Sequence, residues 1–285
     1  SVENSDLKEI RTLGQDIAGQ YGMATQIDLQ IKPELPTLFS DKAGREEDPN
    51  AENTGIFIRS LKARDPYDAI DSLATTFGFP GVEPNTVLVS LSALSSDPEK
   101  GNNLVQHIMD LDHNFLLLDT SNHKPFGNKQ KIDIWWRGLS NNGELMLQLT
   151  KFLTASEDWR QADFRLIMIG TASKRKKRRY DAQREMIKNV LNHFRLNGEI
   201  LLLDNTEPPK EISELISETS SEADLVILGL PTPQQVEKVG FIPFVNGLTE
   251  KIHASVLLVR ASSYFQTREI DIEEKLDEQV IKVEE

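Results

Sequence analysis

The second half of the chain holds five short apolar runs that are nearly continuous rather than alternating. They read KIDIWW (131–136), FRLIMIG (164–170), EILLLD (199–204), DLVILGL (224–230) and SVLLVR (255–260). A strand that is apolar on both sides fits a sheet whose two faces are both covered. The runs therefore predict strands of a buried sheet.

Segments with helical spacing lie between these runs. One helical face carries Leu145, Leu149, Phe152 and Leu153, a second stripe runs from Met186 to Phe194, and a shorter one runs from Ile212 to Ile216. Strands that alternate with helices of this length predict parallel βαβ units with right-handed crossovers. We expect a doubly wound, five-stranded α/β domain at 131–265.

The first half repeats the pattern less completely. Helical spacing covers 6–22, 66–78 and 102–111, and strand-like runs cover 26–32, 56–61, 86–91 and 114–119. The polar segment 33–53 between the first two of these strands predicts a long loop. Leu-Leu-Leu-Asp closes a strand-like run twice, at 116–119 and at 201–204. This echo indicates two related halves, although βαβ units in general resemble one another.

The predicted fold class is α/β, with two tandem doubly wound parallel-sheet subdomains. Residues 1–122 form the first subdomain, which shows no strand-like run before its first helix, and residues 123–265 form the second. The polar segment 121–130 links them. The acidic tail 266–285 either forms one helix anchored by Leu276 and Val280 or stays loose.

Composition narrows the classes of function. The 285 residues carry a formal net charge of −13, which argues against a nucleic-acid binder because phosphates attract a basic surface. The absence of cysteine excludes disulfides, cysteine-ligated zinc and thiol nucleophiles. No run of about 18 apolar residues occurs, and the first residues lack the basic and then apolar pattern of a signal peptide. We expect a protein that works in the cytosol.

Trp135 and Trp136 are adjacent at the end of the first apolar run. Neighbouring side chains of a strand point to opposite faces, so the two indoles cannot form one aromatic platform. We expect one indole under each helical layer, as a core anchor rather than a ligand contact.

No catalytic set is evident in the sequence. Asp133 and Asp204 are candidate general bases, but neither has a nucleophile or a histidine nearby in sequence, and a strand-end aspartate commonly caps the next turn. The histidines are scattered without an HxH or HExxH pattern, at His107, His113, His123, His193 and His253. We expect a protein that is not an enzyme, with no catalytic, cofactor-binding or metal-binding residues.

The turn RGLSNNGE (137–144) follows a predicted strand and opens a predicted helix. Backbone N–H groups and a helix N-terminus at such a place can hold an anion. The chain has neither a GxxxxGK[ST] phosphate loop nor a GxGxxG motif after a strand. We favour a solvated turn.

The run KRKKRR (174–179) places six positive charges together in an acidic chain. A solvated loop is the simpler interpretation. The functional alternative is contact with anionic lipid headgroups, at about 1 kcal/mol per residue near a membrane surface. Nuclear import or RNA contact is a weaker third interpretation.

Several segments, in order along the chain, resemble the cytoplasmic C-terminal domain of cation–chloride cotransporters. They are NTVLVSLS (85–92), IDIWW (132–136), LMLQLTKFLTASEDWRQADFRLIMIG (145–170) with its dipeptide Trp159-Arg160, NVLNHFRLNGEI (189–200), ADLVILGLP (223–231) and LTEKIHASVLLVRA (248–261). Eukaryotic members of that family carry a long phosphorylatable insertion before the late strand. Only TEPPKEI (206–212) stands there in this chain, which is therefore similar to a compact prokaryotic member.

The resemblance implies a regulatory and dimerisation domain on the cytoplasmic side of the cell membrane. Its partners would be a second copy and its own N-terminal transmembrane domain, which would carry chloride together with sodium or potassium. The resemblance also implies halves that look like universal stress proteins. Nucleotide sites of those proteins use closely spaced glycines after the fourth strand, whereas this chain reads Gly229-Leu230-Pro231-Thr232-Pro233, with the next glycine at Gly240. We therefore expect no cofactor.

Two other classes of function stay open on the sequence alone. One is a free-standing tandem universal-stress-like protein that binds a nucleotide. The other is an α/β enzyme, for which the sequence offers no catalytic set.

The segment VGFIPFV (239–245) is the candidate face of a homodimer. It clusters Phe241, Ile242, Phe244 and Val245 between the late strand and the last helix. Uncovered apolar patches mark partner surfaces, so Phe241→Asp would separate the two copies if the segment is exposed. In the alternative, the segment roofs the sheet of its own chain.

Overall fold

A computed structural model describes residues 13, 24–31, 39–40, 56–76, 85–120, 126–137, 140–170, 177–206, 208–231, 236 and 239–264. In chain order these form β1 (Ala24–Ile31), β2 (Phe39–Ser40), β3 (Ile56–Ala63), α2 (Pro66–Thr76), β4 (Thr86–Ser90), α3 (Leu91–Ser95), α4 (Pro98–Asp110), β5 (Asn114–Asp119), β6 (Lys131–Trp135), α5 (Asn141–Ala155), β7 (Asp163–Gly170), α6 (Lys177–Phe194), β8 (Glu199–Asp204), α7 (Ile212–Thr219), β9 (Leu225–Gly229), α8 (Phe241–Thr249) and β10 (Ser255–Arg260). The acidic tail 266–285 lies outside the described residues.

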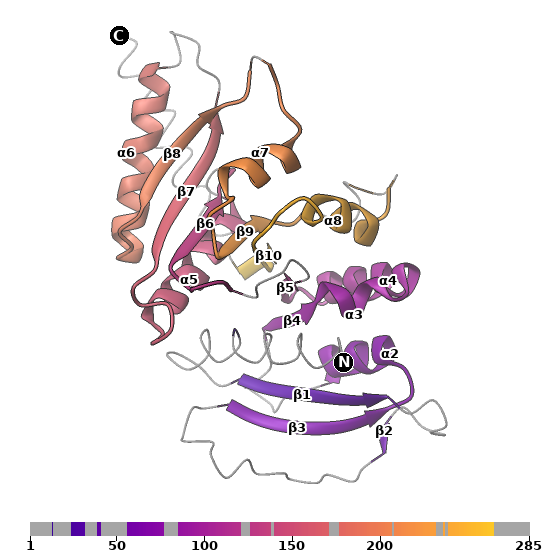
Figure 1. The fold of residues 1–285 in the computed structure, drawn as a ribbon. Coiled ribbons are helices and arrows are strands. Elements are labelled where there is room, and N and C mark those ends of the chain that lie inside the picture. The colour runs from indigo at the N-terminus through magenta and orange to yellow at the C-terminus, as the bar shows by residue number, and fades with distance from the viewer. Residues whose placement is uncertain are drawn as a thin grey trace.

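A seven-stranded sheet with the order β4-β5-β10-β9-β6-β7-β8 dominates the fold, and a three-stranded sheet has the order β1-β3-β2 (Figure 1). From β10 to β8 all neighbouring strands of the large sheet are parallel. Two core clusters cover its opposite faces. Side chains of α4, α7 and α8 contribute to one cluster, and those of α5 and α6 to the other. The predicted α/β class, with a doubly wound and mostly parallel sheet, is confirmed.

The strands of the first half divide between the two sheets, whereas the sequence predicted one sheet for them. β1 pairs with β3 in the small sheet. β4 and β5 join the large one, where β5 runs antiparallel to β10 with Leu117 opposite Leu258. All six residues of β5 are buried, so this strand needs a neighbour on each side as well as cover on both faces. Strands from both sides of the predicted boundary at residue 122 thus share one sheet, and the boundary itself stays a prediction.

The predicted linker contains a tightly held turn ahead of β6. The carboxylate of Asp224, just before β9, accepts three backbone hydrogen bonds at 2.7–3.0 Å from Asn128, Gln130 and Lys131. Gly127 sits inside this turn with φ +44°, and a Cβ there would lie 1.9 Å from Asp224 Oδ1. Only glycine fits such a position, because both the backbone angle and the space exclude a side chain.

The two adjacent tryptophans lie in different core layers, as predicted. Trp135 is 7% exposed and packs in the cluster with α7, whereas Trp136 is 3% exposed and packs in the cluster with α5. The indole N–H of Trp135 donates to Ser220 Oγ at 3.1 Å. Among the described residues, the buried Nε1 of Trp136 has no hydrogen-bond partner.

Replacing each tryptophan by phenylalanine should separate hydrogen bonding from packing. Both changes remove the same part of the indole and leave similar voids. Trp135→Phe also leaves the buried Ser220 hydroxyl without its donor, whereas Trp136→Phe deletes a donor that has no acceptor. We expect the free energy of unfolding in urea to fall by about 1–3 kcal/mol more for Trp135→Phe than for Trp136→Phe. Equal losses, or the reverse order, would contradict these contacts.

Candidate functional site

The candidate site lies at the carboxyl ends of the parallel strands. Ligands of open α/β sheets bind where the strand order reverses. Here the chain leaves β6 for β7 on one side and returns to β9 on the other, so the reversal lies between β6 and β9. The first turn of α5 and the end of β9 meet at this point. The segment 137–144, for which the sequence favours a solvated turn over an anion site, therefore stands where a ligand would bind, although residues 138–139 lie outside the described part.

Asn142 occupies this crevice. Its amide Nδ2 donates to the carbonyl oxygen of Leu230 at 3.1 Å, and its Oδ1 accepts from the backbone N–H of Ala261 at 2.8 Å. One side chain thus ties the chain segments that follow β9 and β10 to the start of α5. A Cβ on Gly229 would lie 3.4 Å from the Asn142 amide, so this glycine lies against a protein side chain. The arrangement serves as a structural tie, and both hydrogen-bonding ends of the amide are used.

The start of α5 carries a conventional N-cap. Ser140 Oγ accepts from the backbone N–H of Gly143 at 3.3 Å. Such a cap satisfies one of the free N–H groups of the first turn, which an anion would otherwise find available. Sequence reasoning singled out the turn but missed Asn142. The only sequence signal for Asn142 was its place in a pair of asparagines directly after Ser140.

A small polar cavity of about 70 Å³ lies beside the crevice, between the α4–β5 turn and the end of β10. Asn141, His113 and Arg260 contribute to its lining. Asn141 Oδ1 is buried and, within the described ranges, has no hydrogen-bond partner. His113 Nε2 donates to the carbonyl oxygen of Ala74 at 3.0 Å. Because about 10–15 Å³ of such cavity volume is enough to hold one water molecule, the cavity suits a few water molecules or a small ion rather than a nucleotide.

Asp112 and Asn114 hold the chain where it leaves the sheet. The backbone N–H of Ser263 donates to Asp112 Oδ1 at 2.7 Å, and the Ser263 hydroxyl donates to the other carboxylate oxygen. Asn114 Oδ1 accepts from the backbone N–H of Ser262 at 2.8 Å. The hydroxyl of Ser263, followed by its backbone N–H, lowers the pKa of Asp112 below its usual value.

The hydrogen bonds from Ser263 to Asp112 should make the stability of the protein depend on pH in the acidic range. The folded pKa of Asp112 lies below the unfolded value of about 3.9, so its contribution is present above that pH and is lost as pH falls through the folded pKa. Asp112→Asn removes the charge and still tolerates the backbone φ of 58°. We expect the variant to be less stable than the parent at pH 6 and to converge with it as pH falls below the folded pKa of Asp112. Urea denaturation across pH measures the gap, and a gap that stays constant would contradict the assignment.

The candidate bases have structural roles in the described chain. Asp133 is fully buried and accepts two hydrogen bonds from Arg165, from Nε at 2.8 Å and from Nη2 at 2.6 Å. Asp204 caps the turn after β8, because its Oδ1 accepts from the backbone N–H and the hydroxyl of Thr206 at 3.2 and 2.7 Å. Asp204 thus acts as the strand-end cap that its position suggested.

The described histidines lie on different helices and connecting segments of the fold. His107 Nδ1 contacts the carboxylate of Asp71 between α4 and α2, and the ring of His193 lies edge-on to Phe194. His123 lies outside the described residues. In the described ranges, no group of three or more histidine and acidic side chains could hold a metal ion.

The basic run 174–179 falls largely outside what the structure describes. Lys177, Arg178 and Arg179 open α6, and residues 174–176 lie outside the described ranges. The lipid contact therefore stays a prediction. Within the described residues, no helix combines the length and the apolar character needed to cross a bilayer.

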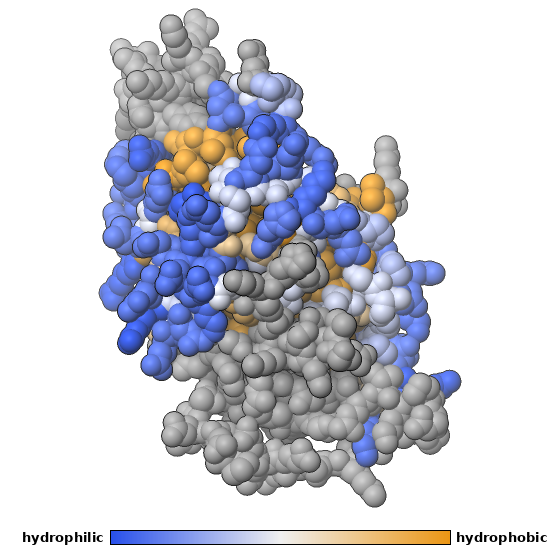
Figure 2. Space-filling view, viewed as in Figure 1, coloured by the Kyte–Doolittle hydropathy of each residue, from blue (hydrophilic) through white to orange (hydrophobic). Residues whose placement is uncertain are grey.

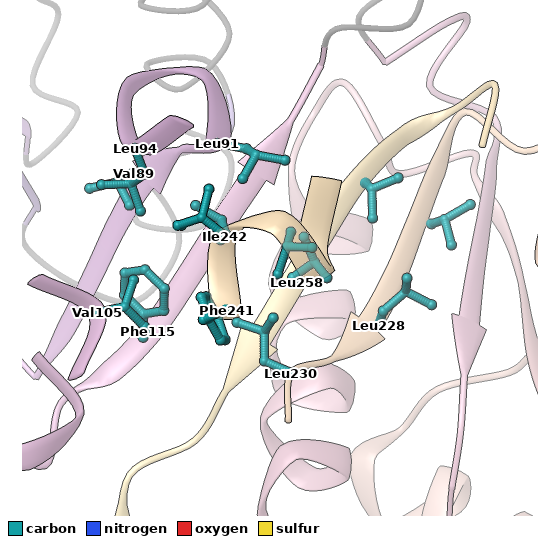
Figure 3. Packing of buried hydrophobic residues seen from close by; sticks show 14 of the residues in the cluster. Val89, Leu91, Leu94, Val105, Phe115, Leu228, Leu230, Phe241, Ile242 and Leu258 are labelled. Atoms are coloured by element: carbon teal, nitrogen blue, oxygen red, sulfur yellow. The ribbon is translucent and has the colours of Figure 1, made fainter. Parts of the chain in front are cut away.

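The candidate dimer segment 239–245 is mainly interior, so the idea that it exposes Phe241 is wrong. Phe241 is 2% exposed, and Ile242 and Val245 are fully buried. Figure 3 shows Phe241 and Ile242 reaching from α8 toward Phe115 and Leu258 of the sheet. The first turn of α8 is fixed as well, since Asn102 Oδ1 accepts from the backbone N–H of Ile242 at 2.8 Å. The segment covers the sheet of its own chain, and its exposed residues are Val239, at 62%, and Pro243.

Known structures share this architecture. The crystal structure of the cytoplasmic domain of a prokaryotic cation chloride cotransporter matches with a TM-score of 0.60 at 16% sequence identity, over 90% of this chain and 92% of that one. A universal stress protein from Archaeoglobus fulgidus matches with a TM-score of 0.47 at 10% identity, over 73% of this chain and 71% of that one. No family model and no curated protein sequence matches the chain. The first of these similarities shows that the chain shares the fold of that cytoplasmic domain.

Proposed function

We propose that this chain is the non-enzymatic regulatory and dimerisation domain of a cation–chloride cotransporter, on the cytoplasmic side of the cell membrane. The observation that carries the proposal is a fold match that spans both halves, over 90% of this chain and 92% of the cotransporter domain. The ordered sequence segments around Trp135-Trp136, Trp159-Arg160 and the late strands agree with it. Its transport partner is a membrane domain that moves chloride with sodium or potassium.

The short connection between β8 and α7 fits this role without an inserted regulatory loop. Asn205 closes the connection on itself, since its Nδ2 donates to the carbonyl oxygen of Lys210 at 3.0 Å and its Oδ1 accepts from the Lys210 backbone N–H at 2.8 Å. The proposal therefore includes no phosphorylated insertion at this place, unlike the eukaryotic members of the family.

Expression of the complete reading frame tests the proposal. We expect about twelve apolar spans, each of about 20 residues, to precede this domain. Cells should then take up rubidium or sodium in a chloride-dependent way. Deleting the domain should alter the uptake rate or the amount of assembled transporter. A reading frame without such spans, or uptake that ignores chloride, would overturn the proposal.

The alternative function is nucleotide binding by a stand-alone stress-like protein. The contacts of Asn142 with Leu230 and Ala261 argue against it, because they occupy the crevice at the strand reversal. We expect millimolar ATP, ADP or AMP to leave the thermal midpoint unchanged. A saturable rise of several degrees would favour the alternative, because a ligand stabilises the folded state by RT ln(1 + [L]/Kd).

A further inference from the structure

Two strands of the large sheet share the sequence Leu-Leu-Leu-Asp but differ in their surroundings. β5 lies inside the sheet between β4 and β10, and all its residues are buried. β8 is the last strand of the order, and in the described part of the chain it pairs with β7 alone. Its four central residues are only partly buried. An apolar strand with one open edge is a template for pairing with another chain.

The open edge is also apolar on the face that carries α7. Leu201 and Leu203 point to that face, with Ile169 of β7 opposite Leu203, and Ile169 is 41% exposed. α7 has only eight residues, and Leu201 and Leu203 are only partly buried beside it. Figure 2 shows apolar surface gathered there, over β7 and β8 and beside α7.

The pairing of β5 with β10 shows what such an edge accepts. There the leucines of β5 lie opposite an antiparallel strand of similar composition, with Leu116 opposite Val259 and Leu118 opposite Leu257. The partner strand is continuous in Val and Leu, and no charged side chain opposes a leucine. An apolar strand that paired antiparallel with the open side of β8 would form hydrogen bonds with the free backbone groups of β8, as β10 does with those of β5.

We propose that β8 pairs antiparallel with β8 of a second copy, about a two-fold axis through Leu202. Opposed residues of a sheet share one face, so the axis sets Leu201 opposite Leu203 of the second copy and Leu202 opposite itself. On the α7 face, an apolar row then runs from Ile169 through Leu203 across the axis. The inference supplies the surface for the homodimer in the proposed function.

Strand alternation and apolar contact select this register over its neighbours. An axis between Leu201 and Leu202 is excluded, because it would set residues of different faces opposite each other. The axis at Leu202 sets Asp204 opposite Ile200 on the other face, where Asp204 already accepts hydrogen bonds from Thr206. An axis at Leu201 would set Glu199 opposite Leu203 and interrupt the apolar row on the α7 face. Each chain carries −13, so association should strengthen as salt screens the repulsion.

The absence of native cysteine allows a direct test of the register. Directly opposed residues of antiparallel strands have Cα atoms about 4.5–5.5 Å apart, within the range that a disulfide bridges. With oxidised glutathione as the oxidant, Leu202→Cys should form a disulfide-linked dimer. Leu201→Cys and Leu203→Cys should link to each other when mixed, and much less to themselves. The control is Val239→Cys, exposed just before α8, which packs against α4 rather than beside β8; it should stay monomeric on a denaturing gel.

Sedimentation of the full chain at moderate salt gives the second readout. Leu202→Lys places two positive charges on the axis and should raise the dimer Kd at least tenfold, while Val239→Lys should leave it unchanged. A dimer that persists in Leu202→Lys, together with a Leu202→Cys variant that does not cross-link, overturns this surface and leaves the homodimer proposal standing. A monomer at tens of micromolar in every buffer, without cross-linking, overturns both.

Discussion

Phe241→Asp is expected to unfold the protein rather than to separate two folded copies. The ring of Phe241 is 2% exposed and lies at the first residue of α8, inside the cluster that covers the sheet. Removing a buried phenylalanine ring costs about 3–5 kcal/mol. A carboxylate without a partner in the same place adds several more, or stays neutral at the expense of a raised pKa. The summed loss approaches the whole free energy of unfolding of a typical domain, roughly 5–15 kcal/mol.

Circular dichroism and urea denaturation should therefore show a largely unfolded variant at 25 °C. Val239→Asp is the matched control, because Val239 is two residues away and 62% exposed. We expect that control to stay within about 0.5 kcal/mol of the parent, as surface substitutions usually do. A folded Phe241→Asp monomer with native stability would return the segment 239–245 to the protein surface.

The sequence predicted the second half well because continuous apolar runs report burial directly. A strand such as DLVILGL or SVLLVR carries apolar side chains on both faces, which only a covered sheet accommodates. The alternation with helical stripes then allowed only parallel βαβ units. The opposite placement of Trp135 and Trp136 followed from strand geometry alone.

The division of the first half between two sheets could not be predicted in the same way. β5 and β8 read almost alike, as NFLLLD and EILLLD, yet one lies inside the sheet and the other at its edge. Local composition sets how apolar a strand is, whereas its neighbours depend on pairings between residues far apart in sequence. The antiparallel contact of β5 with β10 is one such pairing.

The polar residues of the candidate site escaped prediction for a related reason. Asn142, Asp112 and Asp224 each bind backbone groups more than 85 residues away along the chain. Nothing in their local sequence separates them from ordinary turn or cap residues. Phe241 shows the converse case. From sequence alone, an apolar cluster beside prolines and glycines can either cover the sheet of its own chain or form an exposed surface patch. Only the packing decides between the two.

Asp133→Ala is expected to lower the free energy of unfolding by about 3–5 kcal/mol, the usual loss when one partner of a buried ion pair is removed. Asp133 is fully buried, and the Arg165 side chain is 17% exposed. Arg165 makes a two-pronged contact with this carboxylate and also donates to the carbonyl oxygen of Thr219 at 3.0 Å. The hydrogen bonds to Asp133 raise the pKa of Arg165 further. An arginine side chain stays protonated in proteins even without such a partner, so the guanidinium is charged in the variant and has lost its counter-charge.

The Asp133→Leu, Arg165→Met pair should separate the ion pair from the packing around it. Well-packed apolar side chains often replace a buried ion pair at little net loss, because the desolvation of two charges disappears with their attraction. We expect the double variant to recover most of the stability that each single change loses, which a double-mutant cycle in urea measures. Additive losses would mean that the two side chains act independently. A loss below about 1 kcal/mol for Asp133→Ala would mean that water replaces the carboxylate, and would make Asp133 a candidate for chemistry again.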